Sequence, residues 1–180
     1  HIDIPVYRIL RDTDVDGEHT VSYELASGDS WVASDARAVT GWFNGYVTQL
    51  NEGEADGSQL RRIVRLTKKF ARSRLPWKER TTSGICVTKL VVDNFAARAD
   101  RDDLALRDTW HAMHRVLCGS LRILHPVSGT SDLASEGDTE VGFLRQCVGG
   151  ALRDLQDLDS SDCTRTKARG VWDRVFSTSF

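Results

Sequence analysis

The sequence lacks several features that would place it in a class at once. No apolar run approaches the roughly 18 residues of a membrane-spanning helix, and the first residues show no basic and apolar signal-peptide pattern. None of the four cysteines forms a CxxC pair, so we expect free thiols in a reducing cytoplasm. The 180 residues are 40% hydrophobic and 28% charged, which indicates a soluble protein with one domain, or one domain and part of a second.

Acidic residues are scarce in one stretch, residues 61–80. That stretch contains nine lysines and arginines and one acid, whereas residues 1–60 contain eleven acids and three basic residues. A cationic stretch in a chain of net charge −2 favours a focused anion site, such as a triphosphate pocket or a short nucleic-acid contact. The alternative is a solvated amphipathic helix, although such a face normally mixes charges of both signs.

The spacing of apolar residues changes near residue 34. Apolar residues alternate over 1–10 and 19–25, which predicts two strands joined by a loop with the hairpin signal Asp16-Gly17. Two strands without a larger sheet are not stable by themselves, so we expect them to complete a sheet whose other strands lie elsewhere. From Ser34, a plausible N-cap, the spacing becomes helical. Helices are predicted at about 34–50, 58–74, 83–95, 102–122, 140–157 and 161–176. The predicted fold class is therefore α+β, mostly α.

Three polar residues are candidates for chemistry. Asp3 lies on the polar face of the first predicted strand, where a carboxylate would suit Mg²⁺, although a solvated edge residue is the plain alternative. Lys68 lies in the basic helix and could meet a phosphate as a point charge. Ser83 begins the next predicted helix, where a hydroxyl and free N–H groups form an anion site. An ordinary N-cap explains the same serine, and both roles are compatible.

A second cluster, His111, His114 and Cys118, lies at i, i+3 and i+7 on one helical face, and His125 follows. Zinc accepts nitrogen and sulfur ligands of this kind. The favoured alternative is a half-buried polar helix face with a core thiol, because this spacing without a CxxC or HExxH signature is common by chance.

Several segments, in this order, resemble the cGAS/DncV-like nucleotidyltransferases, the bacterial CD-NTases of anti-phage signalling. HIDIPVY resembles the strand that carries their third catalytic Asp, and QLRRIVRLTKKF their Arg-rich helix with a lysine and an aromatic residue. TTSG stands where they have a serine at the start of the next helix. ILHPVSGTSDLAS resembles their Asn-Pro-type loop, and ALRDLQDL with GVWDRVFSTSF resembles their final helices.

This resemblance implies a domain organisation and a reaction. Residues 1–33 would be the C-terminal strands of a nucleotidyltransferase core. Residues 34–180 would be the poly(A)-polymerase/oligoadenylate-synthase-like helical domain that closes one side of the nucleotide cleft. The reaction would join nucleoside triphosphates, ATP and/or GTP, into a cyclic di- or trinucleotide and release pyrophosphate.

The resemblance also implies roles for five residues. Asp3 would be the third carboxylate of a site for two Mg²⁺ ions and would help to activate the attacking ribose hydroxyl. Lys68 and Ser83 would hold the triphosphate. Tyr7 and Arg65 would line the nucleotide pocket.

The Gly-Ser loop and the first two carboxylates of that family are absent from this sequence. One aspartate cannot hold two metal ions, so we expect the chain to work with a missing N-terminal half or a companion chain, and to be inactive alone. Defence-system accessory proteins are further expected partners, and a membrane is not. Two alternatives stay open: a non-cyclising nucleotidyltransferase that acts on RNA or protein, and a nucleotide-binding module without catalysis.

Overall fold

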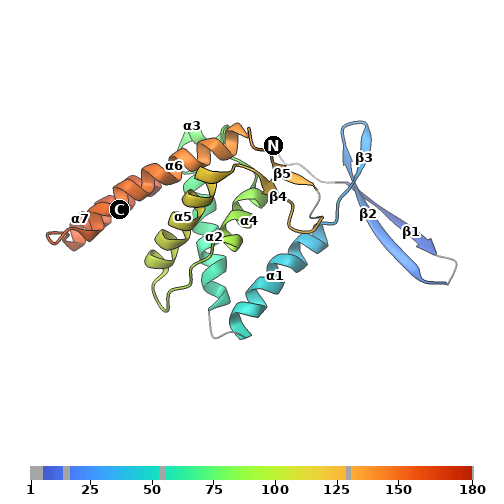
Figure 1. Ribbon diagram of the computed structural model, residues 1–180, viewed down its shortest axis with the longest axis horizontal. Coiled ribbons are helices and arrows are strands. Elements are labelled where there is room, and N and C mark those ends of the chain that lie inside the picture. The colour runs from blue at the N-terminus through green and yellow to red at the C-terminus, as the bar shows by residue number, and fades with distance from the viewer. Residues whose placement is uncertain (1–5, 14–16, 53–55, 129–130, 180) are drawn as a thin grey trace. The chain divides into compact units, whose positions relative to one another are not determined.

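The computed structural model describes four stretches of the chain, residues 6–13, 17–52, 56–128 and 131–179 (Figure 1). The chain forms two compact units, His1–Phe43 and Asn44–Phe180. It is mostly helical with short antiparallel strands, which confirms the predicted α+β, mostly α class. The predicted domain boundary between residues 33 and 34 coincides with the end of the last strand of the first unit and stays a prediction.

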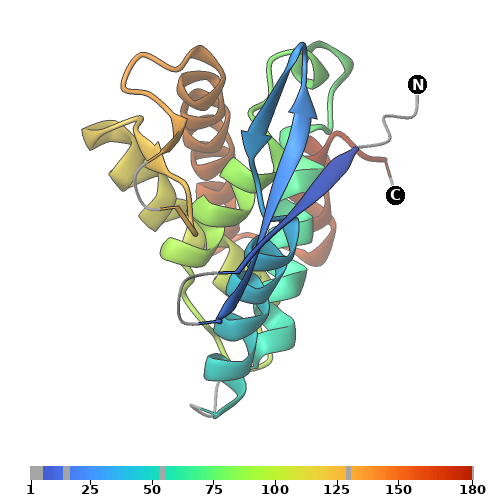
Figure 2. The same ribbon diagram turned by 90° about the vertical axis from the view of Figure 1, so that its right-hand side faces the viewer.

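The first unit contains a three-stranded antiparallel sheet in the order β1-β2-β3 (Figure 2). Its strands are β1 (Tyr7–Thr13), β2 (His19–Ser27) and β3 (Ser30–Ala33). The second predicted strand is present as β2. Of the first, predicted over residues 1–10, residues 1–5 lie outside the described residues, and β1 runs from Tyr7 to Thr13. Strand β3 was not predicted, because four residues are too few for a visible alternation. Gly28 adopts φ +57°, a value that favours glycine, and so reverses the chain between the paired residues Ser27 and Ser30.

Helix α1 (Ala36–Glu52) follows the sheet. The predicted N-cap, Ser34, is wrong by one residue, since the carboxylate of Asp35 accepts hydrogen bonds from the backbone N–H groups of Arg37 (2.9 Å) and Ala38 (3.2 Å). A carboxylate is favoured at this place because it also complements the positive end of the helix dipole.

The second unit is a helical bundle with one small hairpin. Helices α2, α4 and α5 pack against one another, α6 packs on α5, and α7 packs on α6 (Figure 1). The bounds are α2 (Gly57–Ala71), α3 (Leu75–Lys78), α4 (Gly84–Asp93), α5 (Asp102–Gly119), β4 (Ile123–Leu124), β5 (Asp132–Ala134), α6 (Thr139–Leu155), a 3₁₀ turn (Gln156–Asp159) and α7 (Arg165–Phe176).

An aromatic cluster lies at the centre of this bundle. Phe70 and Trp110 are almost fully buried, with ring centroids 4.5 Å apart. The indole N–H of Trp110 donates to the hydroxyl of Thr67 (2.9 Å), which in turn donates to the carbonyl of Ile63 (2.9 Å). The side-chain polar atoms of Trp110 and Thr67 thus have hydrogen-bond partners, so burying them does not offset the favourable free energy of burying the aromatic rings. The apolar stripe predicted for α2 is thus confirmed as core.

Helix α2 begins with a close backbone contact. A Cβ atom at Gly57 would lie 2.3 Å from the carbonyl oxygen of Val47 in α1, a distance that backbone atoms cannot accommodate. The N–H of Gly57 donates to the side chain of Asn51 (2.8 Å), which fixes the turn between α1 and α2. Glycine is required here by space rather than by its φ angle.

Three local predictions are corrected in this unit. The segment between the predicted helices 58–74 and 83–95 contains the short helix α3, with Pro76 in its first turn. The loop expected after Leu124 is part of the hairpin β4–β5. The last helix starts at Arg165 and not at residue 161, because Thr164 caps it through the N–H of Lys167 (3.3 Å). Over the described ranges, no helix is both long and apolar enough to cross a membrane.

Candidate functional site

Two of the predicted site residues, 15 positions apart in sequence, meet where α4 packs along α2. A Cβ atom built on Gly84, the first residue of α4, would lie 3.7 Å from the Nζ atom of Lys68. Ser83 is the N-cap of the same helix, and its hydroxyl accepts a hydrogen bond from the N–H of Cys86 (3.3 Å). The ammonium of Lys68 therefore lies beside the N-terminus of α4.

The N-terminus of α4 also offers backbone N–H donors beside the Lys68 ammonium. The first N–H groups of any α-helix have no partner inside the helix. The hydroxyl of Ser83 occupies the N–H of Cys86, which leaves the N–H groups of Gly84 and Ile85 for another acceptor. Such groups, together with the helix dipole, favour a negative charge at this point.

The electrostatics of Lys68 favour an anion as well. Its side chain is half-buried, and burial, followed by the charge of Arg72 one turn later, lowers the pKa of its ammonium below the usual value. Among the described residues, no carboxylate lies within 4.0 Å of its Nζ atom. A half-buried cation of this kind is stabilised by a bound anion, because the pair regains the Coulomb energy that burial removed.

Much of the remaining basic charge of α2 serves the fold. Arg62 donates to Asp56 (3.0 Å) and forms an ion pair with Asp102 (2.5 Å), and this joins the start of α2 to the start of α5. The hydrogen bond from Ser58, and after it the contact with Arg62, lower the pKa of Asp56 to about 2.

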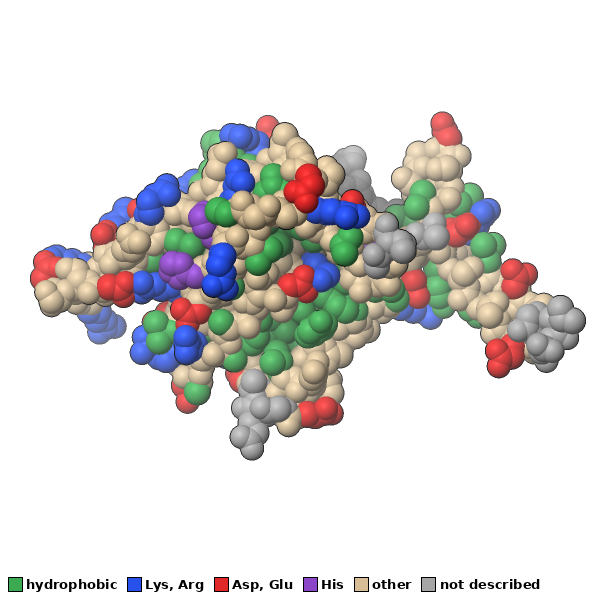
Figure 3. All heavy atoms as spheres, viewed as in Figure 1, with side chains coloured by type: hydrophobic (Ala, Val, Ile, Leu, Met, Phe, Trp, Pro, Cys, Tyr) green, Lys and Arg blue, Asp and Glu red, His purple; other side chains and the backbone are tan. Residues whose placement is uncertain are grey.

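Arg74 likewise has a structural role. Its guanidinium donates to the backbone carbonyls of Arg174 (2.6 Å) and Val175 (3.3 Å), close to the C-terminus of α7, where a cation complements the helix dipole. On the face of the helical unit shown in Figure 3, basic and acidic side chains are interspersed. Arg62 and Arg74 are therefore engaged within the fold, and Lys68 and Arg72 are among the basic residues left for the predicted focused anion site.

The other three predicted site residues have different outcomes. Asp3 lies outside the described residues, so its place as a metal ligand stays a prediction. Tyr7 opens β1 in the first unit, where it lines a small pocket together with Tyr23 and Arg37. Arg65 is exposed, and its Nε atom donates to the carbonyl of Arg61 one turn earlier (3.4 Å), which does not bring it against Ser83.

The histidine and cysteine cluster of α5 comes together only in part. The Sγ atom of Cys118 lies 3.8 Å from Nδ1 of His114, and His114 packs against Gly149 of α6. Within the parts of the chain that the structure describes, no three His, Cys, Asp or Glu side chains form a group able to hold a metal ion. Of the predicted zinc ligands, His114 and Cys118 are therefore adjacent, and among the described residues no third candidate lies with them.

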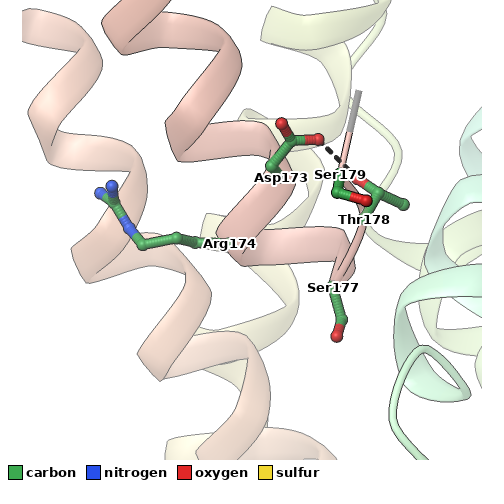
Figure 4. Close-up of a pocket in the computed structure, with 5 residues that line it drawn as sticks. All are labelled: Asp173, Arg174, Ser177, Thr178 and Ser179. Carbon is green, nitrogen blue, oxygen red and sulfur yellow. Dashed lines mark hydrogen bonds between the residues drawn. The ribbon is translucent and has the colours of Figure 1, made fainter.

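A hollow at the end of α7 is formed by five consecutive or nearly consecutive residues (Figure 4). The hydroxyl of Thr178 donates a hydrogen bond to the carboxylate of Asp173 (2.8 Å) and so closes the end of the helix. Ser177 adopts the left-handed conformation of a helix C-cap. Figure 4 shows Arg174 pointing away from the other four side chains. These groups do not converge on a common point, and we assign no site to them.

One part of the site was not predicted. The backbone N–H groups of Gly84 and Ile85 are not among the predicted site residues. A Cβ atom at Gly84 would be in ordinary van der Waals contact with Lys68, so the approach of the ammonium does not depend on the glycine. The serine N-cap is the available signal, because the first N–H groups after it have no partner inside the helix. A scan against protein-family models found no match for the sequence.

Proposed function

We propose that the helical unit binds the triphosphate of a nucleotide between Lys68 and the N-terminus of α4. The observation that carries this is the half-buried ammonium beside Gly84 and the Ser83 cap, without a carboxylate partner among the described residues. A triphosphate supplies the missing negative charge, and its oxygens accept hydrogen bonds from the ammonium and from backbone N–H groups.

We further propose that this chain is part of an Mg²⁺-dependent nucleotidyltransferase that makes a cyclic di- or trinucleotide in anti-phage defence. This step rests on the resemblance of the ordered segments, in which Lys68 and Ser83 are the triphosphate residues. Asp3 would be the third carboxylate for the two Mg²⁺ ions, which would orient the phosphates and stabilise the charge that develops during transfer.

The exposed apolar side chains of the sheet support the proposal that the first unit binds a partner. Every residue of β1 is exposed, and Val6, Ile9 and Val21 keep 57%, 52% and 49% of their surface. In the described residues, β1 pairs only with β2, so its other edge has free backbone groups. We propose that strands carrying the other two carboxylates, from a preceding segment or a companion chain, join the sheet at this edge.

The test has two stages. The chain alone is expected to bind ATP or GTP in titration calorimetry and to make no product from labelled triphosphates and Mg²⁺. When the polypeptide with the other two carboxylates is supplied, a phosphatase-resistant cyclic product is expected. Asp3→Ala should abolish that product, and the matched change Asp12→Ala, at an exposed acid of β1, should not.

The two alternatives give different results in the same assay. A non-cyclising enzyme would yield labelled RNA or protein and no cyclic product. Triphosphate binding that persists in the complete assembly without any transfer, and independently of Asp3, would identify a binding module instead of an enzyme.

A further inference from the structure

A second pocket of the helical unit lies between α6 and the segment that links α2 to α3. Its volume is 320 Å³, which is in the range of sites for small ligands. Its floor is apolar, since Phe70, Ala151 and Val175 are all buried. The lining includes neither Lys68 nor Ser83, so this pocket is distinct from the proposed triphosphate site.

Two aromatic rings form one wall of this pocket. Trp77 and Phe143 stand perpendicular to one another, with centroids 5.9 Å apart and an interplanar angle of 89°. The guanidinium of Arg74 covers the Trp77 ring at 4.1 Å, and that of Arg80 covers the Phe143 ring at 4.0 Å. Because Arg74 is itself tied to the end of α7, the aromatic wall is ordered before any ligand binds.

Polar groups of α6, the helix that also carries Phe143, complete the lining. Gln146, Gly150 and Asp154 follow one another at intervals of four residues and so share one face of the helix. Gly150 leaves this wall open, because the nearest atom to a Cβ there would be the Arg153 guanidinium at 3.9 Å. Within the described stretches, the side chains of Gln146 and Asp154 have no hydrogen-bond or ion-pair partner.

The charges around the pocket narrow the chemistry of the ligand. A guanidinium covers one face of each aromatic ring, and this nearby positive charge disfavours a cationic ligand. The remaining groups are aromatic surfaces suited to stacking, a carboxylate that only accepts hydrogen bonds, and an amide that both donates and accepts. The thiol of Cys147, also in the wall, stays protonated at neutral pH because burial raises its pKa.

We propose that this pocket binds the guanine-type base of a nucleoside or nucleotide. Guanine presents two adjacent N–H donors, from its ring nitrogen and its exocyclic amine, along one edge, and these match the two oxygens of Asp154. Adenine presents one amino donor beside a ring nitrogen that accepts, and this nitrogen repels a carboxylate. The base stacks on the aromatic surface of Trp77 and Phe143 that the guanidinium groups leave uncovered, and Gln146 contacts its remaining polar edge.

Guanosine is the probe that tests this proposal, because it has no phosphate and cannot use the Lys68 site. In calorimetry with the 180-residue chain, guanosine is expected to bind and adenosine to bind at least about tenfold more weakly. Asp154→Asn should weaken guanosine binding by about tenfold or more, since the charge-assisted hydrogen bonds to the carboxylate are lost. The matched control is Glu140→Gln, which removes an exposed acid from the first turn of the same helix and should have no effect.

A second variant fills the pocket. Gly150→Leu adds volume to the open wall, and leucine favours the helix more than glycine does, so the fold is preserved. It should abolish guanosine binding and leave triphosphate binding intact, whereas Lys68→Met should do the reverse. The proposal is overturned by absence of guanosine binding up to its solubility limit, by equal affinity for adenosine, by equal effects of Asp154→Asn and Glu140→Gln, or by loss of guanosine binding in Lys68→Met.

Discussion

Replacing Lys68 with Met is expected to weaken triphosphate binding without destabilising the fold. Methionine keeps the length and apolar stem of lysine and removes only the charge. The ammonium is half-buried, and its pKa is lowered by burial and by Arg72. A lowered folded-state pKa means that the charged form opposes folding at neutral pH, and this penalty is relieved only as pH rises through the folded and unfolded pKa values. Lys68→Met should therefore unfold at the same temperature as the parent protein or at a higher one.

The loss of affinity follows from the contacts that the ammonium would make. Hydrogen bonds to charged groups contribute about 1.5–3 kcal/mol each, so the loss of one should raise the Kd for a triphosphate by about 10- to 150-fold. Titration calorimetry with ATP and with inorganic triphosphate measures the affinity, and thermal unfolding measures the stability.

The matched control for this prediction is Lys69→Met. Lys69 is the next residue on α2, has the same charge and is exposed. The Lys69→Met change should raise the Kd for a triphosphate by a few-fold at most, since exposed charges act through screened, long-range attraction. Equal effects of the two variants, or a Lys68→Met protein that is unstable but binds normally, would refute the reasoning.

Three further changes probe the site and its support. Ser83→Asp keeps an effective N-cap and should leave the melting temperature unchanged or higher, yet weaken triphosphate binding by at least about tenfold through repulsion; unchanged affinity in calorimetry would contradict it. Arg62→Gln should lower stability at pH 7. This difference should shrink as pH falls from about 4 to about 2. Arg62 is the largest cause of the lowered pKa of Asp102, and after Ser58 it helps to lower the pKa of Asp56 from 3.8 to about 2; both contributions are lost on protonation. A difference that denaturant titrations find to be independent of pH would exclude this ion pair as the cause. Gly57→Ala should cost about 1–3 kcal/mol in the free energy of unfolding because a backbone oxygen occupies the space, whereas Gly170→Ala, in an open part of α7, should stabilise by about 0.5–1 kcal/mol. Equal effects of the two glycine variants would show that the close contact at Gly57 carries no strain.

Local signals in the sequence account for most of the helices and for the first hairpin. The apolar stripe of α2 and the alternation of β1 and β2 extend over enough residues for their periods to be visible. The hairpin β4–β5 escaped prediction because strands of two and three residues have no period. The start of α7 depended on Thr164, a cap that only its hydrogen bond identifies.

The candidate site could be predicted in its parts and not in its assembly. Lys68 was recognisable from the excess of basic charge, and Ser83 from its place before an apolar helix. Their meeting depends on the packing of α4 along α2, which no local pattern specifies.

The structural use of the neighbouring arginines was invisible in the sequence for the same reason. Arg62 reaches Asp102, and Arg74 reaches the carbonyls of α7, across separations of 40 and 100 residues. A count of charges along the chain therefore overestimates the cationic surface that is available to a ligand.

The most direct test of the central claim is the place at which a triphosphate binds. In amide NMR spectra of the 180-residue chain, titration with inorganic triphosphate should shift the N–H signals of Gly84 and Ile85 most strongly, and Lys68→Met should suppress these shifts. Shifts confined to the exposed basic residue Lys78 and its neighbours, with Gly84 and Ile85 unchanged, would contradict the proposed triphosphate site.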